Sequence, residues 1–511
     1  MPASRIHMEV RLMSEAQRCL FTPSFNRAVK IRQRDSRLTS HAGAIILREA
    51  DHRLGLIESV VDRMCDPRNP DKVRYTLPEL LRERIFALAL GESAQDDADR
   101  LAHDPALRMA TWDRPGEQVL DERLASQPTQ SRLVDILADR SEHLEALRDA
   151  LADWTERHLR STGGDHAVRY GTLDIDSFPV LVAGRQPGGA YNGYYKETVY
   201  HPLLASFAVV GDYDSPMQGQ RLGNGFVHAI LRAGNAGSAQ GMVRFVDKAL
   251  EKCQGLGVVL DVRIDAGLTH GAVLDHLTDR KTRFVGRLKS NAVLDRLAEP
   301  YLRRPVGRPP REGYETIVEL GPYQAEPWRY AQRLILVVVD QPDPRTGQLN
   351  LLPRHFFIVT NWTAEEKDAQ DVLEHYRRRG TFEDRIGEFN ATVHPRLSSP
   401  KFAENEALLL LSLLSFNLSS MLRNELEASI GGCWDLGRFQ QTVLRAAGRV
   451  VRGGRRLWLD LEAAFTPLWE KVLACLQRWR LPKRWKTPHG PSRRAWIPPP
   501  PHAHLHLTLR L

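Results

Sequence analysis

The pattern of apolar residues changes near residue 171, and this change constrains the fold more than any other feature of the chain. From Thr39 to about His158, apolar residues recur every three or four positions, which is typical of amphipathic helices. After Gly171, short β-branched runs alternate with helical stretches. Such alternation is typical of an α/β fold, in which helices cover a sheet. The sequence therefore predicts an α/β core that follows a helical region.

The predicted strands of this core fall into two groups, separated by a stretch of different composition. Residues 291–354 contain a proline and glycine cluster from Pro305 to Pro310, followed by two alternating apolar runs. We expect this stretch to form a β-rich insertion. A buried strand at 355–360 and a polar helix at 364–390 resume the core, and an apolar helix at 403–426 follows. The first group of strands covers residues 173–182, 200–210, 226–233, 257–264 and 283–288, with a helix at 237–250.

A chain of 511 residues is too long for one core, so several domains are expected. Its net charge of +8 fits a polyanionic partner without requiring one. Basic residues interleaved with tryptophans between Gln441 and Trp496 favour contacts with phosphates and bases, although a solvated surface is an equally good interpretation. The predicted parts are a disordered or mis-assigned start at 1–30, a helical region at 31–160, a core at 165–290 and 355–430, the insertion at 291–354, a basic helical region at 431–485 and a disordered tail at 486–511.

Cysteine usage and hydropathy limit the class of protein. The five cysteines form no Cys-x-x-Cys pair, so neither a zinc site nor a disulfide framework is expected. The most apolar run, Ala407 to Leu418, is too short to cross a bilayer and is predicted to be a buried helix. No signal peptide is evident at the N-terminus. We expect a cytoplasmic protein without a membrane partner.

Carboxylates end two of the predicted strands. In the run Leu-Asp-Ile-Asp, Asp174 and Asp176 share one face of the strand, where burial is costly without a compensating cation. A divalent metal is one such cation, and contact of this face with solvent is the alternative. Asp265 ends the apolar run at 258–264, at the edge where α/β sheets form ligand sites. Its alternative role is to cap a following helix, and Asp261 is a weaker candidate on the same strand.

A third carboxylate lies on the predicted helix at 364–390. Tyr376, Arg379, Glu383 and Asn390 fall within an arc of roughly 60° at the helical period. This face suits a metal ligand beside groups that hold phosphate. Gly380 in mid-helix costs about 1 kcal/mol and suits close approach of another backbone. The alternative is a solvated helix stabilised by an Arg379–Glu383 pair.

Together, Asp176, Asp265 and Glu383 form a set of carboxylates from three separate segments. Two strand carboxylates and one helix carboxylate can hold a pair of Mg²⁺ ions, or Mn²⁺ in their place, which is what cleavage of a phosphodiester requires. Asp174 is a further candidate ligand and the alternative to Asp176. Lys289, just beyond a strand end, is placed to reach DNA. In a basic chain, this set points to DNA strand transfer.

Several motifs resemble those of bacterial insertion-sequence transposases of the DDE type, in the group with a Tyr-Arg-Glu-Lys signature. The signature here reads Tyr376-x2-Arg379-x3-Glu383-x6-Asn390, with asparagine in place of the final lysine. The likeness runs from about residue 30 to 460. The other stretches that carry it are Ile31-Arg32-Gln33-Arg34-Asp35, Leu124-Ala125-Ser126-Gln127-Pro128-Thr129, Tyr191-Asn192-Gly193-Tyr194-Tyr195 and Tyr200-His201-Pro202-Leu203.

The resemblance implies an RNase H-like catalytic core with a β-strand insertion between the second aspartate and the glutamate. It implies that Asp176, Asp265 and Glu383 bind two metal ions, and that Tyr376 and Arg379 hold a DNA phosphate. The implied partners are target DNA and the terminal inverted repeats of the element. The resemblance also implies that the region at 31–160 binds these repeats, and that the protein acts as a homodimer in a synaptic complex. A nuclease of the same fold and an inactive DNA-binding regulator are the alternatives.

Overall fold

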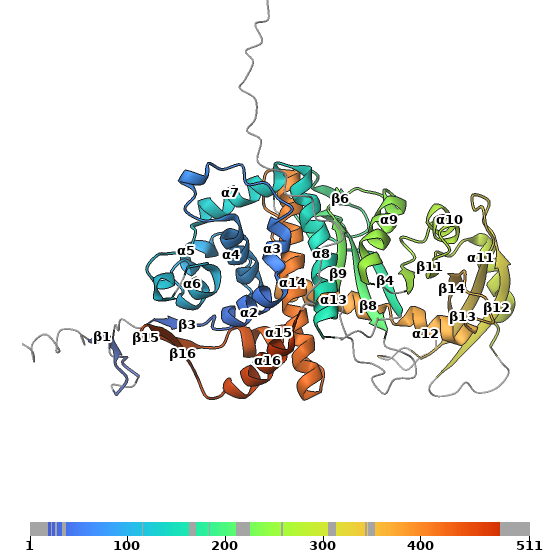
Figure 1. Ribbon diagram of the computed structural model, residues 1–511. Coiled ribbons are helices and arrows are strands. Elements are labelled where there is room, and N and C mark those ends of the chain that lie inside the picture. Colours follow the sequence, from blue (N-terminus) through green and yellow to red (C-terminus); the bar gives the residue numbers. More distant parts are fainter. Residues whose placement is uncertain are drawn as a thin grey trace, which may run out of the picture.

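A helical block and a large β-sheet make up most of the structure, and two long helices, α8 (Ser141–Thr162) and α14 (Phe402–Ile430), lie where they meet (Figure 1). The computed structural model describes residues 19–480 except 22, 26–27, 33–36, 115, 163–169, 183, 211–224, 257–258, 305–312, 343–344 and 346–352. The predictions for residues 1–18 and for the tail, including Trp485 and Trp496, lie outside the described residues.

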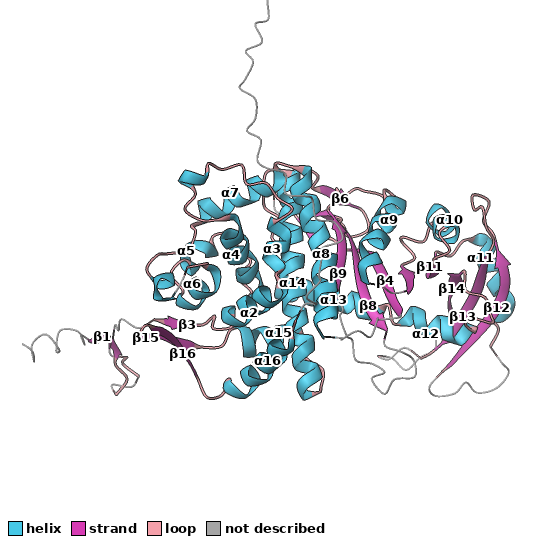
Figure 2. Ribbon diagram, viewed as in Figure 1, coloured by secondary structure: helices cyan, strands magenta, loops and turns pink. Residues whose placement is uncertain are grey.

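The large sheet is built from two sets of strands (Figure 2). The first set is β4 (Tyr170–Ser177), β8 (Leu203–Val210), β9 (Gly225–Ile230), β10 (Val259–Ile264) and β11 (Arg283–Leu288). The second set is β12 (Tyr314–Tyr323), β13 (Gln332–Asp340) and β14 (Arg354–Thr360). Within the described residues, they form one eight-stranded sheet in the order β12-β13-β14-β11-β10-β4-β8-β9. The predicted α/β class is confirmed.

The first set of strands has mixed directions, which fixes where its strand ends meet. β4, β8 and β9 are antiparallel neighbours, whereas β10 runs parallel to both β4 and β11. Parallel neighbours need a crossover connection, and α9 (Met242–Cys253) and α10 (Gly271–Asp279) supply it. The carboxyl ends of β4 and β10 therefore lie side by side at one edge of the sheet.

The predicted β-rich insertion is not a separate layer, because its strands continue the main sheet. β12 and β13 pair antiparallel, β13 pairs with β14, and β14 pairs antiparallel with β11. The stretch also contains the short helices α11 (Ala292–Ala298) and η4 (Glu299–Tyr301) before β12, which its composition did not reveal. The insertion thus lengthens the sheet on the side away from β9.

The helical block and α14 share one apolar core. Buried residues of the block pack with residues of α14 and of the later helices α13 (Gly380–Thr392) and α16 (Thr466–Arg478), while a second core lies between the sheet, α9 and α10. The helices of the block are α2 (Ala44–Leu54), α3 (Leu56–Val61), η1 (Pro70–Lys72), α4 (Leu77–Ala89), α5 (Asp97–Leu101), α6 (Pro105–Thr111), η2 (Gly116–Leu120) and α7 (Gln127–Ala138).

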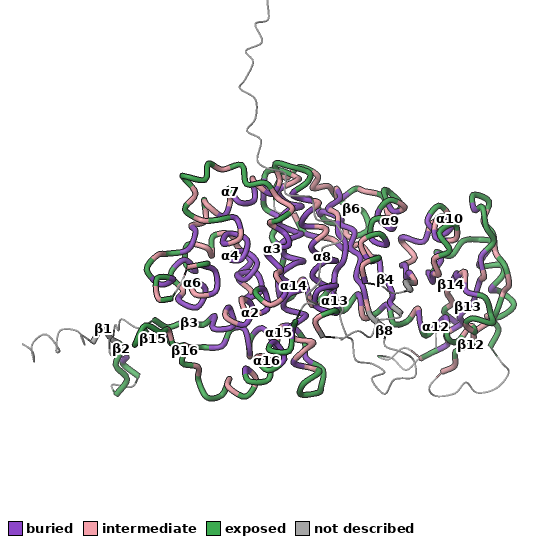
Figure 3. The backbone as a smooth tube through the Cα atoms, in the orientation of Figure 1, coloured by how far each residue is buried: buried purple, intermediate pink, exposed green. Residues whose placement is uncertain are grey.

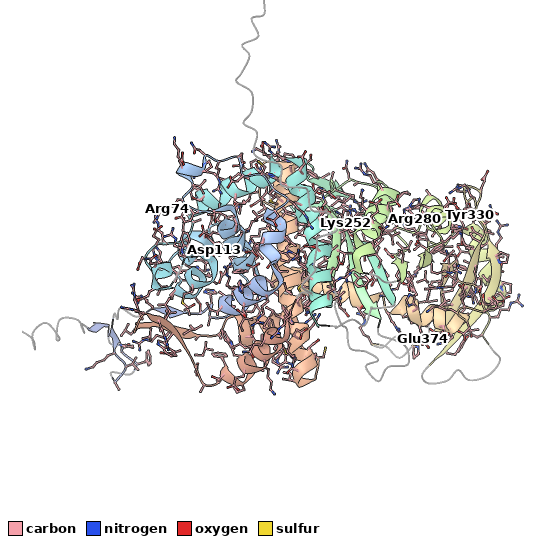
Figure 4. The ribbon with its side chains drawn as sticks, viewed as in Figure 1. Arg74, Asp113, Lys252, Arg280, Tyr330 and Glu374 are labelled. Carbon is pink, nitrogen blue, oxygen red and sulfur yellow. The ribbon has the colours of Figure 1, made fainter. Side chains whose placement is uncertain are left out.

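Helix α14 is a core helix, as its composition predicted, although it is longer than expected. Among the described residues, it is the one helix long and apolar enough to cross a membrane, but its most apolar window is completely buried inside the protein. Figure 3 shows the same burial along α14 and α8. On the sheet side, Lys252 of α9 forms ion pairs with Glu145 and Asp149 of α8 (Figure 4). These contacts link the helical block to the helix α9 that covers the large sheet.

The two ends of the described chain meet in a second, small sheet. β3 (Leu38–Thr39) pairs with β15 (Gly448–Gly453), which forms a hairpin with β16 (Arg456–Leu461). The described part of the predicted basic helical region, residues 431–480, also contains this hairpin, which separates α15 (Leu436–Phe439) and the π-helical turn η5 (Gln440–Leu444) from α16. The remaining elements are β1 (Cys19–Phe21), β2 (Ile31–Arg32), β5 (Val180–Leu181), β6 (Ala190–Asn192), β7 (Glu197–Tyr200) and η3 (Gln254–Leu256).

Gly43, just before α2, is where the backbones of the two ends come closest. Its N–H donates to the Leu444 carbonyl at 3.0 Å, and a Cβ at this position would lie 2.3 Å from the Leu444 Cα. Replacing Gly43 with alanine is expected to lower the free energy of unfolding by about 1–3 kcal/mol, the usual range for overpacking. Urea unfolding measures this change. Gly387→Ala in α13, where a Cβ meets no atom within 4 Å, is the control and should not destabilise the protein; equal stability of both variants would contradict the prediction.

Candidate active site

The three predicted carboxylates come from three elements that the fold brings to one edge of the sheet. Asp176 lies near the end of β4, and Asp265 directly follows the neighbouring parallel strand β10. Glu383 lies in the first turn of α13. The guanidinium of Arg379 joins two of them: it pairs with a carboxylate oxygen of Asp176 and, at 2.5 Å, with Oε1 of Glu383. Arg379 is thus the centre of the site in this structure.

Asp174 has a different partner from Asp176, although both lie on the same face of β4. It stands directly opposite Arg263 of β10 in the parallel register, and Arg263 donates two hydrogen bonds to its carboxylate at 2.6 and 2.7 Å. Both side chains are almost completely buried, at 3% and 4% exposed. Arg263 also donates to the His375 carbonyl at 3.0 Å. The cation that compensates buried Asp174 is therefore an arginine.

The helix predicted at 364–390 is two helices with a break at the signature residues. α12 (Ala369–Arg377) ends just before Arg378, and α13 begins at Gly380 with Arg379 as its N-cap residue. The Arg379 N–H donates to the Tyr376 carbonyl at 2.9 Å, which is a hydrogen bond of the tighter i to i−3 type. A Cβ on Gly380 would meet no protein atom within 4 Å. The single continuous helix was therefore a wrong prediction, and Gly380 faces open space.

Burial and neighbouring charges set the electrostatics of the site. Burial raises the pKa of Asp176 to about 6, although Arg379 acts in the opposite direction; Asp265 and Glu383 add to the rise. Burial opposes the charge of Arg379, yet Asp176 and Asp265 keep its pKa above the ordinary value. The three carboxylates therefore interact with one another, and the arginine is held among them as a cation.

Asp265 lies in a turn and does not cap the next helix. Its carboxylate accepts the N–H groups of the two following residues, at 3.2 Å for Gly267. Its carbonyl accepts the hydroxyl of Thr269 at 2.7 Å. The N-cap residue of α10 is His270, so the capping alternative is wrong. The turn holds the Asp265 carboxylate at the carboxyl edge of β10.

The remaining predicted residues of the site are Tyr376, Asn390 and Lys289. Tyr376 is partly buried against an apolar cluster, and burial raises its pKa, with Asp265 contributing to the rise. Asn390 lies two turns beyond Glu383 on α13, partly buried. Lys289 is exposed immediately after β11. Within the described residues, no hydrogen bond or ion pair connects Asn390 or Lys289 to the three carboxylates.

Two residues that support the site, Arg263 and His375, were not assigned a role from the sequence. Asp261, Arg263 and Asp265 alternate along one face of β10; Asp261 Oδ1 lies 3.1 Å from Nε2 of His375, so this pair and Arg263 fasten α12 to the sheet. The period of two in this run was visible in the sequence. Its partners were not, because the register of β10 against β4 is a property of the fold.

A cavity of about 880 Å³ lies beside α13 but on a different side from the carboxylates. It runs between α13, α14 and the segment that follows α14. Several of its acidic groups already have partners: Glu388 accepts hydrogen bonds from Arg423, and Glu427 accepts one from the Trp434 N–H. The cavity is lined by Thr381, Asp384 and Glu388 of α13 but by none of the three carboxylates.

The donor set of the site fits a hard divalent cation. Carboxylate oxygens are the ligands preferred by Mg²⁺ and Mn²⁺. In the part of the chain that the structure describes, no group of three or more His, Cys, Asp or Glu side chains is close enough to hold a metal ion as it stands. Instead, Arg379 places its positive charge between Asp176 and Glu383. A cation therefore already lies among these carboxylates.

Comparison with known families assigns the chain to a family of transposases. Residues 21–481 match the family described as transposase DDE domain group 1. No curated protein sequence shows significant similarity to the chain. The matched region contains Asp176, Asp265 and Glu383 and covers most of the chain. The chain belongs to the transposase DDE domain family.

Proposed function

We propose that this transposase cuts the DNA ends of an insertion sequence and joins them to target DNA, with Asp176, Asp265 and Glu383 as its catalytic residues. The observation that carries the proposal is the convergence of two strand-end carboxylates and a helix carboxylate around Arg379. The bacterial insertion-sequence group and the role of its Tyr-Arg-Glu signature belong to this proposal. DNA is the partner that the family implies.

The three carboxylates are proposed to hold Mg²⁺, as two ions, with Mn²⁺ as a substitute. Members of the family generally use divalent metal ions. When bound, such ions supply an activated water or 3′-hydroxyl and stabilise the leaving oxygen of an in-line displacement. Asp174 is not proposed as a ligand, because Arg263 occupies its carboxylate. Asp176 is therefore the preferred residue on β4.

Arg379 and Tyr376 are proposed to hold a DNA phosphate beside the cut. A guanidinium matches the geometry of a phosphate and donates to two of its oxygens. Arg379 is 8% exposed, so its orientation is fixed by packing before DNA arrives. Asn390 and Lys289 are proposed to make further contacts with the backbone of DNA. The helical region at 31–160 is proposed to bind the terminal inverted repeats within a homodimer in the bacterial cytoplasm, at the nucleoid.

A supercoiled plasmid that carries the ends of the element tests this function. Excision of the segment in the presence of Mg²⁺ supports a transposase. Nicking at random positions instead supports a nuclease without strand transfer, and binding without cleavage supports an inactive regulator. The second and third outcomes each overturn the proposed reaction.

Arg379→Met is expected to make the protein more dependent on a divalent ion for its stability. Without metal, removal of the cation leaves Asp176 without its ion pair and costs about 1–3 kcal/mol. Mn²⁺ should therefore raise the melting temperature of this variant more than that of the wild type. Thermal unfolding with and without Mn²⁺ measures the difference, and Arg379→Lys, which keeps the charge, is the control. Equal Mn²⁺ effects in all three proteins would argue against metal binding at these carboxylates.

A further inference from the structure

The small sheet of β16, β15 and β3 has two faces of different character. Directly paired residues of antiparallel strands share a face. One face, which we call the outer face, therefore carries the following paired residues: Arg449 with Leu38 and with Asp460, Val451 with Trp458, and Gly453 with Arg456. The opposite, inner face carries Val450, which is 3% exposed, and it packs toward the helical block.

The outer face exposes large apolar surface that no described residue covers. Trp458 is 55% exposed and Leu38 is 65% exposed. Apolar surface that gathers on one exposed face and is rimmed by polar residues marks interaction sites. Apolar residues of the inner face, such as Leu459, are instead packed against the core. The exposure is therefore specific to one face of the sheet.

The arginines of the hairpin form ion pairs on the inner face but not on the outer face. Arg452, on the inner face, forms ion pairs with Glu117 and Asp121 around η2. Arg449 and Arg456 on the outer face, and Arg455 at the turn, are exposed and form no ion pair with any described residue. Asp460 is the one carboxylate among the outer-face positions. Positive charge is neutralised where the hairpin meets the protein and left free where it meets solvent.

The turn of the hairpin presents this charge in a fixed conformation. Gly454 and Arg455 both have a φ of +63°, as in the tight two-residue turns that match the twist of a hairpin. The left-handed conformation costs a residue with a side chain roughly 1–2 kcal/mol, and Asn, Asp or Gly is the usual choice. An arginine at such a strained position indicates that this turn has a functional role.

We propose that the outer face binds double-stranded DNA. Arg449, Arg455 and Arg456 contact backbone phosphates, and the ring of Trp458 packs against the sugars of the same strand. Guanidinium groups suit phosphates, and such contacts supply most of the affinity of proteins for duplex DNA. The proposal rests on the proposed function, because the bound duplex is the DNA that the transposase recombines.

The position of the sheet indicates which part of the DNA it holds. In Figure 1, β15 and β16 lie at the end of the molecule opposite to β12, with the helical block and α14 between them and the large sheet. The outer face is therefore far from Asp176 and Asp265. The outer face binds DNA beyond the site of cleavage. It therefore contributes affinity for DNA, whereas the carboxylates carry out the chemical step.

Charge reversal on the outer face tests the proposal. The double variant R449E/R456E is compared with R244E/K248E, which reverses two exposed cations of α9 that lie outside every proposed DNA contact. Fluorescence anisotropy with a duplex carrying the end of the element, in EDTA and at several salt concentrations, gives the affinity and its salt dependence. Each phosphate contact contributes about 0.9 to the slope of log K against log salt. We expect R449E/R456E to bind roughly 10- to 100-fold more weakly at 0.1 M salt, with a slope smaller by about 2.

Trp458 provides an independent measurement that does not involve charge. Trp458→Ala is expected to weaken duplex binding by about 5-fold, the lower end of what loss of an aromatic contact to a nucleotide costs, and Trp458→Phe should restore most of the loss. Circular dichroism and thermal unfolding should show wild-type folding for all of these variants, because the substituted side chains are exposed. If R449E/R456E and Trp458→Ala keep the affinity and salt slope of R244E/K248E, the outer face does not bind DNA and its partner is of another class.

Cleavage assays at saturating DNA separate this proposal from the proposed function. If the wild type cuts the ends and R449E/R456E binds normally, only the outer-face proposal fails. If the wild type binds duplex through the outer face but never cuts, the proposed reaction fails and the binding surface remains. The expected result is a higher DNA concentration for half-maximal cleavage in R449E/R456E, with a maximal rate within about 3-fold of the wild type, because affinity and chemistry reside in different parts of the fold.

Discussion

Asp265→Asn is expected to abolish cleavage of DNA ends while leaving duplex binding within a few-fold of the wild type. The amide keeps the shape of the side chain, and its oxygen accepts one of the two N–H groups that the carboxylate accepts, so the turn after β10 is largely preserved. It removes the negative charge that a divalent ion requires. Loss of an outer-sphere partner of a metal ligand already costs about 10- to 100-fold, so loss of a ligand charge should exceed 100-fold. Cleavage of the plasmid substrate in Mg²⁺ measures the rate, and anisotropy in EDTA measures binding.

Asp261→Asn is the matched control for this experiment, because Asp261 lies on the same face of the same strand. Its carboxylate contacts His375 at 3.1 Å, and it is not proposed as a metal ligand. This variant should retain most of the cleavage activity, with at most a modest loss of stability. Wild-type cleavage by Asp265→Asn would show that the assigned set of catalytic residues is wrong, whatever the behaviour of the control.

The second large effect concerns stability and involves the buried pair of Asp174 and Arg263. Removing one partner leaves the other charge buried without compensation, which typically costs 3–5 kcal/mol, on the order of a third of the stability of a domain. Both side chains are less than 5% exposed, so water does not replace the lost partner. We therefore expect Arg263→Met and Asp174→Leu each to lower the urea midpoint strongly, or to prevent recovery of folded protein.

The double variant Asp174→Leu with Arg263→Met distinguishes a structural pair from a metal ligand. Replacing a whole buried ion pair with apolar residues is often neutral, so the double variant should recover much of the stability lost in each single variant. It should also retain cleavage, because Asp176 rather than Asp174 is the proposed ligand. A stable double variant that no longer cuts would instead assign Asp174 to the metal.

The sequence predicted the helices and strands of the core better than it predicted which strands lie next to each other in the sheet. Alternation of apolar residues located β4 and β10 and placed Asp176 and Asp265 at their carboxyl ends. It did not reveal that Arg263 faces Asp174, because pairing depends on which strands are adjacent. For the same reason, the strands of the insertion were recognised but not their continuity with the main sheet.

Two local features were missed for different physical reasons. The break between α12 and α13 falls at Arg378 and Arg379, directly before Gly380, whose poor helix propensity was interpreted as close approach of another backbone. The contacts of Arg379 with Asp176 and Glu383 hold the break in place. The hairpin of β15 and β16 does carry a signal, since Gly453 and Gly454 separate two alternating runs. Because the segment is rich in arginine, it was interpreted as a basic helical region and not as a hairpin.

The pairing of β3 with β15 has a consequence for how the protein is made. β3 emerges from the ribosome long before β15, the strand that pairs with it. Helices of the N-terminal block can form while the chain grows, but the pairing of the edge at Leu38 and the contact of Gly43 with Leu444 wait for the synthesis of Leu444 and β15. A chain that stops before β15 therefore leaves this edge open to pairing with other molecules. Formation of the small sheet thus requires that the chain has been made at least as far as β15.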